Sequence, residues 1–380
     1  MNDRAREMMA KQMMVAALVL VMLFAAGCGG ESEQKPAISS EQQQKAVHDA
    51  MAEDVAKSAA VGEKADDVQE KMKHTFSQAK APLVKAGEKI TIAVIPKGTT
   101  HEYWNSVKAG AEKASSELGV KMIWKGPLKE NDRAGQIQVV QQFLTGGEID
   151  GMVIAPLDSK ALVRPIQHAV KKGIPVVIID SALDGKPGED YVSFVATDNF
   201  NGGQLGGKEL DKLIGDKGNV VLLRYLVGSA STEQREAGFL DVMHKTPGVK
   251  VLVDNRYAGA TAGDAKIQSL NMIDRVREAD GIFASNEAAT LGMLLALKQV
   301  DLAGKKKFVG FDSSPPLVRG LKEDQIDALV VQNPKKMGYE GVKTLVAYLK
   351  GQKVAQRIDT GVAIVTKANL NDPEIKEMIE

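Results

Sequence analysis

From Lys89 onward, the sequence alternates between short apolar runs and longer stretches with helical spacing. The run Lys89–Pro96 is rich in β-branched residues, and the apolar residues of the next stretch, Tyr103–Leu118, recur every three or four positions. The same unit returns on both sides of Thr197. Continuous apolar strands that alternate with helices indicate parallel sheets covered on both faces. Because the units are too many for one ordinary sheet, the sequence predicts an α/β protein with two doubly wound parallel-sheet lobes.

The composition excludes several classes of protein. Lys and Arg together number 49 and so do Asp and Glu, so the formal net charge of the 380 residues is zero. Nucleic-acid binding usually needs a basic footprint, and none is present. Cys28 is the single cysteine, which excludes an intramolecular disulfide and a multi-cysteine zinc site. The five histidines form no HExxH motif. We therefore expect no metal, no cofactor and no nucleic-acid partner.

The first residues have the layout of an export signal. Arg4, Arg6 and Lys11 precede the apolar run Met13–Ala26, which is shorter than the roughly 20 residues of a membrane span. A charged region, a short apolar region and then small residues are typical of a secretory signal. The sequence that ends at Cys28 resembles a bacterial lipobox, in which the cysteine is lipidated. The alternative is an uncleaved anchor with an incidental cysteine.

We interpret residues 1–27 as a lipoprotein signal peptide and residues 28–88 as a lipidated cysteine followed by a polar tether. The tether region holds more acidic than basic residues and no strand-like run. We expect it to be partly helical and partly disordered, although a helix that docks on a partner is an alternative.

Polar and aromatic side chains recur where the predicted strands end, in both halves of the chain. Ligands of parallel sheets bind outside the carboxyl ends of the strands. Each residue also has a structural alternative: Asp180 and Asn286 could cap helices, and Tyr103 and Trp104 could face a core. Their recurrence favours a ligand cleft. The residues at these strand ends are Thr100, His101, Glu102, Tyr103, Trp104, Ala155, Pro156, Asp180, Ser181, Tyr257, Asn286, Glu287, Asp312 and Gln332.

The usual enzyme motifs are missing from the sequence. A dehydrogenase needs GxGxxG at the first helix, but the loop there reads Pro96-Lys97-Gly98-Thr99-Thr100. A hydrolase of the GxSxG type is not indicated either. The paired glycines at 202–203 and 206–207 lie in a helical stretch and favour close helix packing over a phosphate site. We therefore predict that the protein is not an enzyme.

Several blocks together resemble the periplasmic sugar-binding proteins of ABC transporters, in the ribose-binding-like, type I group. They include VIPKGTTHEYWNSVKAGAE, DGMVIAPLDSKAL, GIPVVIIDS, FVATDN, GSASTEQREAGF, FASNEAATLG, VGFDSSP and VVQNPKKMG. The resemblance covers roughly residues 89–367. It implies two lobes joined by a three-strand hinge, with residues 89–196 and 333–360 in the first lobe and residues 198–332 and 361–380 in the second. Repressors share this fold, but this chain has a signal and tether where they carry a helix-turn-helix.

The resemblance also implies ligand contacts. The family's stacking aromatics match Tyr103, Trp104 and Tyr257, and its carboxylates match Asp180 and Asp312. Its arginine matches Arg235, and its amides match Asn286 and Gln332. His101, Ala155 and Ser181 depart from the ribose pattern, so ribose itself is not implied.

The resemblance to these binding proteins implies a monomer that delivers its sugar to an ABC permease. The resemblance to a lipobox implies that it is lipid-anchored in the periplasm or at the cell surface. The alternative is a ligand-sensing binding protein that acts with a chemoreceptor or a sensor kinase. From the matched residues we expect two carboxylates to face one cation, Arg235, which disfavours an anionic ligand. His101 is expected to be mostly neutral at pH 7, because its ordinary pKa is about 6.5. The predicted ligand is a neutral monosaccharide or polyol.

Overall fold

The computed structural model describes residues 76–77, 79, 82–85, 87–147 and 149–379. The predicted signal peptide, Cys28 and most of the predicted tether lie outside the described residues. Within the described ranges, no helix has the length and apolar character needed to cross a membrane.

The first lobe is built on a six-stranded sheet with the order β13-β6-β5-β4-β2-β3, in which all neighbours are parallel. Alternate residues of each strand face opposite sides, so Ile92 and Val94 of β2 enter one core while Ala93 and Ile95 enter the other. The strands are β2 (Thr91–Ile95), β3 (Lys121–Trp124), β4 (Gly151–Ile154), β5 (Val176–Ile179), β6 (Ser193–Ala196) and β13 (Arg357–Asp359).

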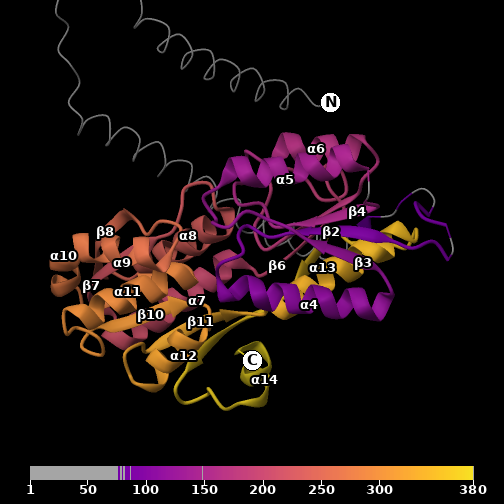
Figure 1. The fold of residues 1–380 in the computed structure, drawn as a ribbon. Helices are drawn as coiled ribbons and strands as arrows, with labels where there is room; N and C mark the ends of the chain where they lie inside the picture. Colours follow the sequence, from indigo (N-terminus) through magenta and orange to yellow (C-terminus); the bar gives the residue numbers. More distant parts are fainter. Residues whose placement is uncertain (1–75, 78, 80–81, 86, 148, 380) are drawn as a thin grey trace, which may run out of the picture. The chain divides into compact units, whose positions relative to one another are not determined.

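Helices cover both faces of this sheet. On one face lie α4 (Glu102–Leu118) and α13 (Pro334–Leu349), and on the other lie α5 (Arg133–Gly146) and α6 (Val163–Lys171) (Figure 1). A Cβ at Gly110 of α4 would overlap the backbone of Lys335, and one at Gly338 of α13 would overlap that of Val107. Glycine is therefore required where these two helices touch.

The second lobe has a six-stranded sheet with the order β14-β11-β10-β9-β7-β8. Four of its neighbour pairs are parallel, and β14 runs antiparallel to β11. The strands are β7 (Lys217–Arg224), β8 (Gly248–Tyr257), β9 (Gly281–Ala284), β10 (Lys307–Phe311), β11 (Ala328–Gln332) and β14 (Val362–Thr366).

The helices of the second lobe also divide between two faces. Leu210 of α7 (Asn199–Ile214) and Phe239 of α8 (Ala230–Lys245) pack on one face of the sheet. The other face is covered by α9 (Ala262–Asn271), α10 (Ile273–Glu278), α11 (Glu287–Gln299) and α12 (Pro315–Lys322), together with α14 (Pro373–Ile379).

The described chain passes between the two sheets three times: after β6, after β11, and between β13 and β14. The predicted fold class, two doubly wound α/β lobes, is confirmed. The second sheet is not purely parallel. The chain leaves β11 at Gln332 for the first lobe and returns into β14 at Val362, which is paired with Gln332, so the two strands run in opposite directions.

The glycines at 202–203 and 206–207 lie in α7 and serve helix packing, as predicted. A Cβ at Gly203 would overlap the backbone oxygen of Arg235 in α8, and one at Gly206 would press on Phe283 of β9. The small residues thus bring α7 close both to α8, which carries Arg235, and to the sheet.

The first lobe begins earlier than residue 89. The strand β1 (Phe76–Ser77) pairs with β12 (Val354–Ala355), and the backbone N–H of Leu83 donates to the oxygen of Leu349. The tether boundary expected at residue 88 is therefore wrong. A two-residue strand is too short to show a hydrophobic period, so the sequence pattern could not reveal it.

Candidate functional site

An aspartate follows a central strand in each lobe. Asp180 comes directly after β5 and Asp312 directly after β10, and both are buried. Their backbones are left-handed, with φ of 63° and 70°. This region is strained for most residues and is tolerated best by glycine, asparagine and aspartate. The two strand ends therefore hold a carboxylate in the same unusual backbone geometry, a feature that clusters at functional sites.

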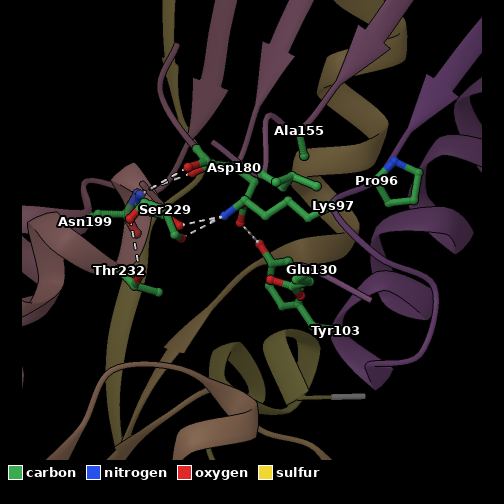
Figure 2. A network of polar contacts seen from close by, with 12 residues as sticks. Pro96, Lys97, Tyr103, Glu130, Ala155, Asp180, Asn199, Ser229 and Thr232 are labelled. Carbon is green, nitrogen blue, oxygen red and sulfur yellow. Dashed lines mark hydrogen bonds and ion pairs between the residues drawn. The ribbon is translucent and has the colours of Figure 1, made fainter. Parts of the chain in front are cut away.

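Lys97, which lies just beyond the end of β2, links the two lobes. Its Nζ lies 2.7 Å from Oδ2 of Asp180 in its own lobe and donates to Oγ of Ser231 at 2.8 Å in the other. Figure 2 shows the Lys97 side chain extended toward Ser229. The Nζ of Lys97 lies 3.5 Å from Oγ of Ser229. Tyr103 completes the surroundings of Asp180 by donating its hydroxyl to Oδ1 at 2.9 Å. Both oxygens of Asp180 thus face donors.

His101 is held between two acceptors. Its Nδ1 lies 2.9 Å from Oε1 of Glu130, and its Nε2 lies 3.0 Å from the backbone oxygen of Ala260 in the second lobe. A carboxylate and a carbonyl oxygen cannot donate, so both ring nitrogens carry protons and the ring is an imidazolium. Trp104 donates its Nε1–H to the same Glu130 oxygen at 2.7 Å.

The pKa values agree with this geometry. Burial by itself lowers the pKa of His101, but the Glu130 carboxylate outweighs it and raises that pKa to about 9. Burial by itself raises the pKa of Glu130, but the His101 charge outweighs it and lowers that pKa to about 2. The expectation that His101 is mostly neutral at pH 7 is therefore wrong, because the sequence did not reveal the carboxylate beside it.

The second lobe contributes a chain of buried polar groups. Gln332 donates its Nε2 to Oδ1 of Asp312 at 2.7 Å, and the backbone N–H of Glu287 donates to Oδ2 at 2.9 Å. Glu287 in turn accepts from the backbone N–H of Tyr103 in the first lobe, at 3.1 Å. Burial raises the pKa of Glu287 to about 7, against the opposing charge of His101, and burial also raises the pKa of Asp312.

Arg235 is buried on α8 and is oriented by neutral partners. Its Nε donates to Oδ1 of Asn199 at 2.8 Å and its Nη1 to the backbone oxygen of Ser285 at 3.1 Å. The guanidinium carbon lies 4.1 Å from the centre of the Phe311 ring, which supports a cation–π contact. Asn286 acts as the N-cap of α11 by accepting from the N–H of Ala289, so its predicted capping alternative holds alongside its place in the pocket.

These groups enclose a small inner pocket with a volume of about 20 Å³. The first lobe contributes His101, Tyr103, Trp104 and Asp180 among the predicted residues. The second lobe contributes Arg235, Asn286, Asp312 and Gln332. The structure thus brings eight of the predicted ligand residues to one place between the lobes.

Two of the predicted ligand residues, Tyr257 and Ser181, lie elsewhere, and the strand-end residue Ala155 does not line the inner pocket either. Tyr257, at the end of β8, does not line the inner pocket, and 41% of its surface is exposed. Ser181 is fully buried, and its Oγ accepts the N–H of Ser231 instead of facing the pocket. Ala155 is also buried, and its backbone oxygen accepts from Gln136.

The predicted ligand contacts omit Lys97, Glu130 and Glu287, although Glu287 is among the residues at the predicted strand ends. Arg235 is therefore not the single cation of the pocket, because Lys97 and protonated His101 add two more. Lys97 also lies at a strand end, so the rule that found Asp180 could have found it. Glu130 follows β3 in a loop without a recognisable motif.

The arrangement suits binding better than chemistry. The Lys97 ammonium donates to Ser231 while it pairs with Asp180, so it is not placed to take a proton from the serine. Among the described residues, no cluster of His, Cys, Asp and Glu could hold a metal ion.

Two α/β lobes with a buried polar pocket between them define the class of two-lobed ligand-binding proteins. Residues 92–353 match the family model described as a periplasmic binding protein domain, so the chain belongs to that family. The family that the sequence resemblance predicted is confirmed.

Several proteins with similar sequences or structures are sugar-binding proteins. The D-ribose/D-allose-binding protein of Pseudomonas aeruginosa is 28% identical over 306 residues, which cover 77% of this chain and 93% of that protein. The D-allose-binding periplasmic protein of Escherichia coli is 31% identical over 267 residues, which cover 69% of this chain and 85% of that protein. A carbohydrate transporter solute-binding protein of Agrobacterium radiobacter, solved in complex with D-arabinose, has a TM-score of 0.73 and 38% identity, over 78% of this chain and 100% of that one.

Proposed function

We propose that this protein is an extracytoplasmic substrate-binding protein that captures a neutral monosaccharide or polyol between its lobes and delivers it to an ABC permease. The observation that carries the proposal is the ring of buried donors and acceptors drawn from both lobes around the inner pocket. The names of the relatives, which bind ribose, allose or arabinose, support it.

The charges of the pocket support a neutral ligand. Lys97, His101 and Arg235 supply three cations. Glu130, Asp180 and Asp312 supply three carboxyl groups to oppose them. Glu287 is about half protonated at neutral pH, because its pKa is about 7. Such a nearly balanced site offers charge-assisted hydrogen bonds to hydroxyl groups without a surplus of either sign. A dry pocket rejects a sugar that leaves one of these groups unpaired.

Binding requires the lobes to move. The inner pocket has room for about one water molecule, so a sugar ring enters only when the Lys97 bridge opens. Contacts from both lobes then favour the closed arrangement with ligand inside. We expect X-ray scattering profiles to differ between the free protein and the protein saturated with sugar.

We further propose that the protein acts as a monomer, lipid-anchored through Cys28 to a bacterial membrane in the periplasm or at the cell surface after removal of residues 1–27. The proposed lobes are residues 89–196 with 333–360 and residues 198–332 with 361–380, and the first lobe also includes the segment that begins at Phe76.

A thermal-shift screen over neutral monosaccharides and polyols, with sugar phosphates and sugar acids as the contrast, tests the proposal. A ligand at 100 times its Kd adds about 2.7 kcal/mol to the free energy of unfolding. Asp312→Asn should abolish that gain. The control Asp301→Asn should keep it, because Asp301 shares the left-handed backbone (φ 55°) but is exposed on the surface. If only anionic sugars stabilise the protein, the proposed ligand class is wrong.

A further inference from the structure

A second cavity adjoins the inner pocket. This outer cavity has a volume of about 190 Å³, roughly ten times that of the inner pocket. The two share Tyr103, Glu287, Asp312 and Gln332 in their walls. A molecule held by these four residues therefore has space to extend into the outer cavity.

Two buried polar atoms in the wall of the outer cavity have no hydrogen-bond partner among the described residues. They are Oγ of Ser314 and Oε1 of Gln332. Ser314 is 7% exposed and Gln332 is 2% exposed, so bulk water does not easily replace a partner. An unsatisfied buried polar atom is costly, and a ligand that pairs with it removes that cost.

The sequence explains why the Ser314 hydroxyl is left over. Ser314 is the N-cap of α12, and an N-cap hydroxyl ordinarily accepts from the backbone N–H groups of the first turn. Pro315 and Pro316 occupy the first two positions of the helix and have no N–H. The N–H of Leu317 donates to the backbone oxygen of Ser314 instead. The hydroxyl is thus available to a ligand.

The remaining walls suit a hydroxylated ligand. Glu102, Glu287 and Asp312 offer carboxyl oxygens, and Lys335 is the only basic residue among the lining residues, so an anion would be repelled. Met378 and Ile379 of α14 add an apolar wall. Sugar rings combine hydroxyl edges with apolar C–H faces, which matches this mixture.

We propose that the outer cavity is a second sugar subsite. The preferred ligand is a neutral glycoside or disaccharide, with one ring held by the inner-pocket residues once the Lys97 bridge has opened and its substituent in the outer cavity. The inference rests on the proposed function and extends its substrate class beyond the free monosaccharide. Ser314 and Gln332 would pair with hydroxyls of the substituent, and α14 would cover its apolar face.

Calorimetric titration of the protein with pairs of ligands tests the inference. The probes are D-allose, D-arabinose and D-fucose, each as the free sugar and as its methyl α- and β-glycosides, together with α- and β-linked hexose disaccharides. We expect at least one substituted sugar to bind at least tenfold more tightly than its parent.

Two variants locate the effect. Ser106→Met places a larger side chain in the wall of the outer cavity from α4, and Ser314→Ala removes the free hydroxyl. Both should lower the ratio of substituted-sugar to parent-sugar affinity, Ser106→Met to one or below and Ser314→Ala severalfold. Ser116→Met, on the exposed side of α4, should leave the ratio unchanged.

The outcomes separate the inference from the function. If free sugars bind and no substituted sugar binds at least tenfold more tightly than its parent, the outer cavity is not a subsite and the proposed function stands. The same holds if Ser106→Met and Ser314→Ala leave the ratio as it is. If no sugar binds at all, the proposed function fails and the inference fails with it.

Discussion

Raising the pH above neutral is expected to destabilise the protein through the pair of His101 and Glu130. The pKa of His101 rises from 6.5 to about 9 in the folded protein, despite the lowering effect of burial, because Glu130 faces it. A shift of that size corresponds to about 3 kcal/mol. Because the folded protein holds the proton more tightly, this stability is fully present below about pH 6.5 and is lost as the pH rises through about 9.

The lowered pKa of Glu130 describes the same attraction from the other partner, so the two contributions are not added. The stability that the lowered pKa of Glu130 contributes is lost only in strongly acidic solution, as the pH falls from about 4.5 through 2. Lys97, Glu287 and Tyr225 also lie near the pair. A variant that lacks both charges of the pair is therefore the reference, because the other groups of the protein titrate in it as they do in the wild type.

The measurement is the free energy of unfolding from urea titrations at about pH 6 and about pH 10, for the wild type and for His101→Gln/Glu130→Gln. The wild type should lose about 3 kcal/mol more than the double variant over this range. Equal losses in the two proteins would refute the reasoning, because the pair would then contribute nothing that depends on the proton.

Three further changes probe other parts of the molecule. Gly203→Ala should destabilise the protein and weaken sugar binding, because its Cβ overlaps the backbone of α8. The control Gly146→Ala in α5 meets open space, so a thermal melt should show that it stabilises the protein by about 0.5–1 kcal/mol. Lys97→Met should cost about 3–5 kcal/mol by leaving Asp180 buried without its cation. Adding Asp180→Asn should recover much of that loss in a double-mutant cycle, and a lack of recovery would argue against the pair. Cys28→Ser should release the protein from membranes on fractionation, and continued membrane association would exclude the lipid anchor.

Much of the fold could be predicted from the sequence because buried parallel strands leave continuous apolar runs. The run Lys89–Pro96 is an example, and it contains the strand β2. The short strand β1 and the antiparallel edge strand β14 were not found in this way. Their pairing depends on where distant segments lie, and a local pattern does not contain that information.

The site was predictable to the extent that strand ends define it. Asp180 and Asp312 follow their strands directly and meet between the lobes. The charged partners of the site residues were harder to find, because Lys97 meets Asp180 and Glu130 meets His101 only in the folded protein. Tyr257 also lies at a strand end, but β8 is the outermost strand of its sheet, and the residue remains partly exposed.

The left-handed backbone at Asp180 and Asp312 limits how the pocket can change during evolution. Most residues at either position would add backbone strain to the loss of a carboxylate, but asparagine tolerates the same conformation. An Asp-to-Asn exchange alters the charge of the pocket by one unit at little conformational cost. These two positions therefore offer a low-barrier route by which descendants of this protein could acquire a differently charged ligand while keeping the same architecture.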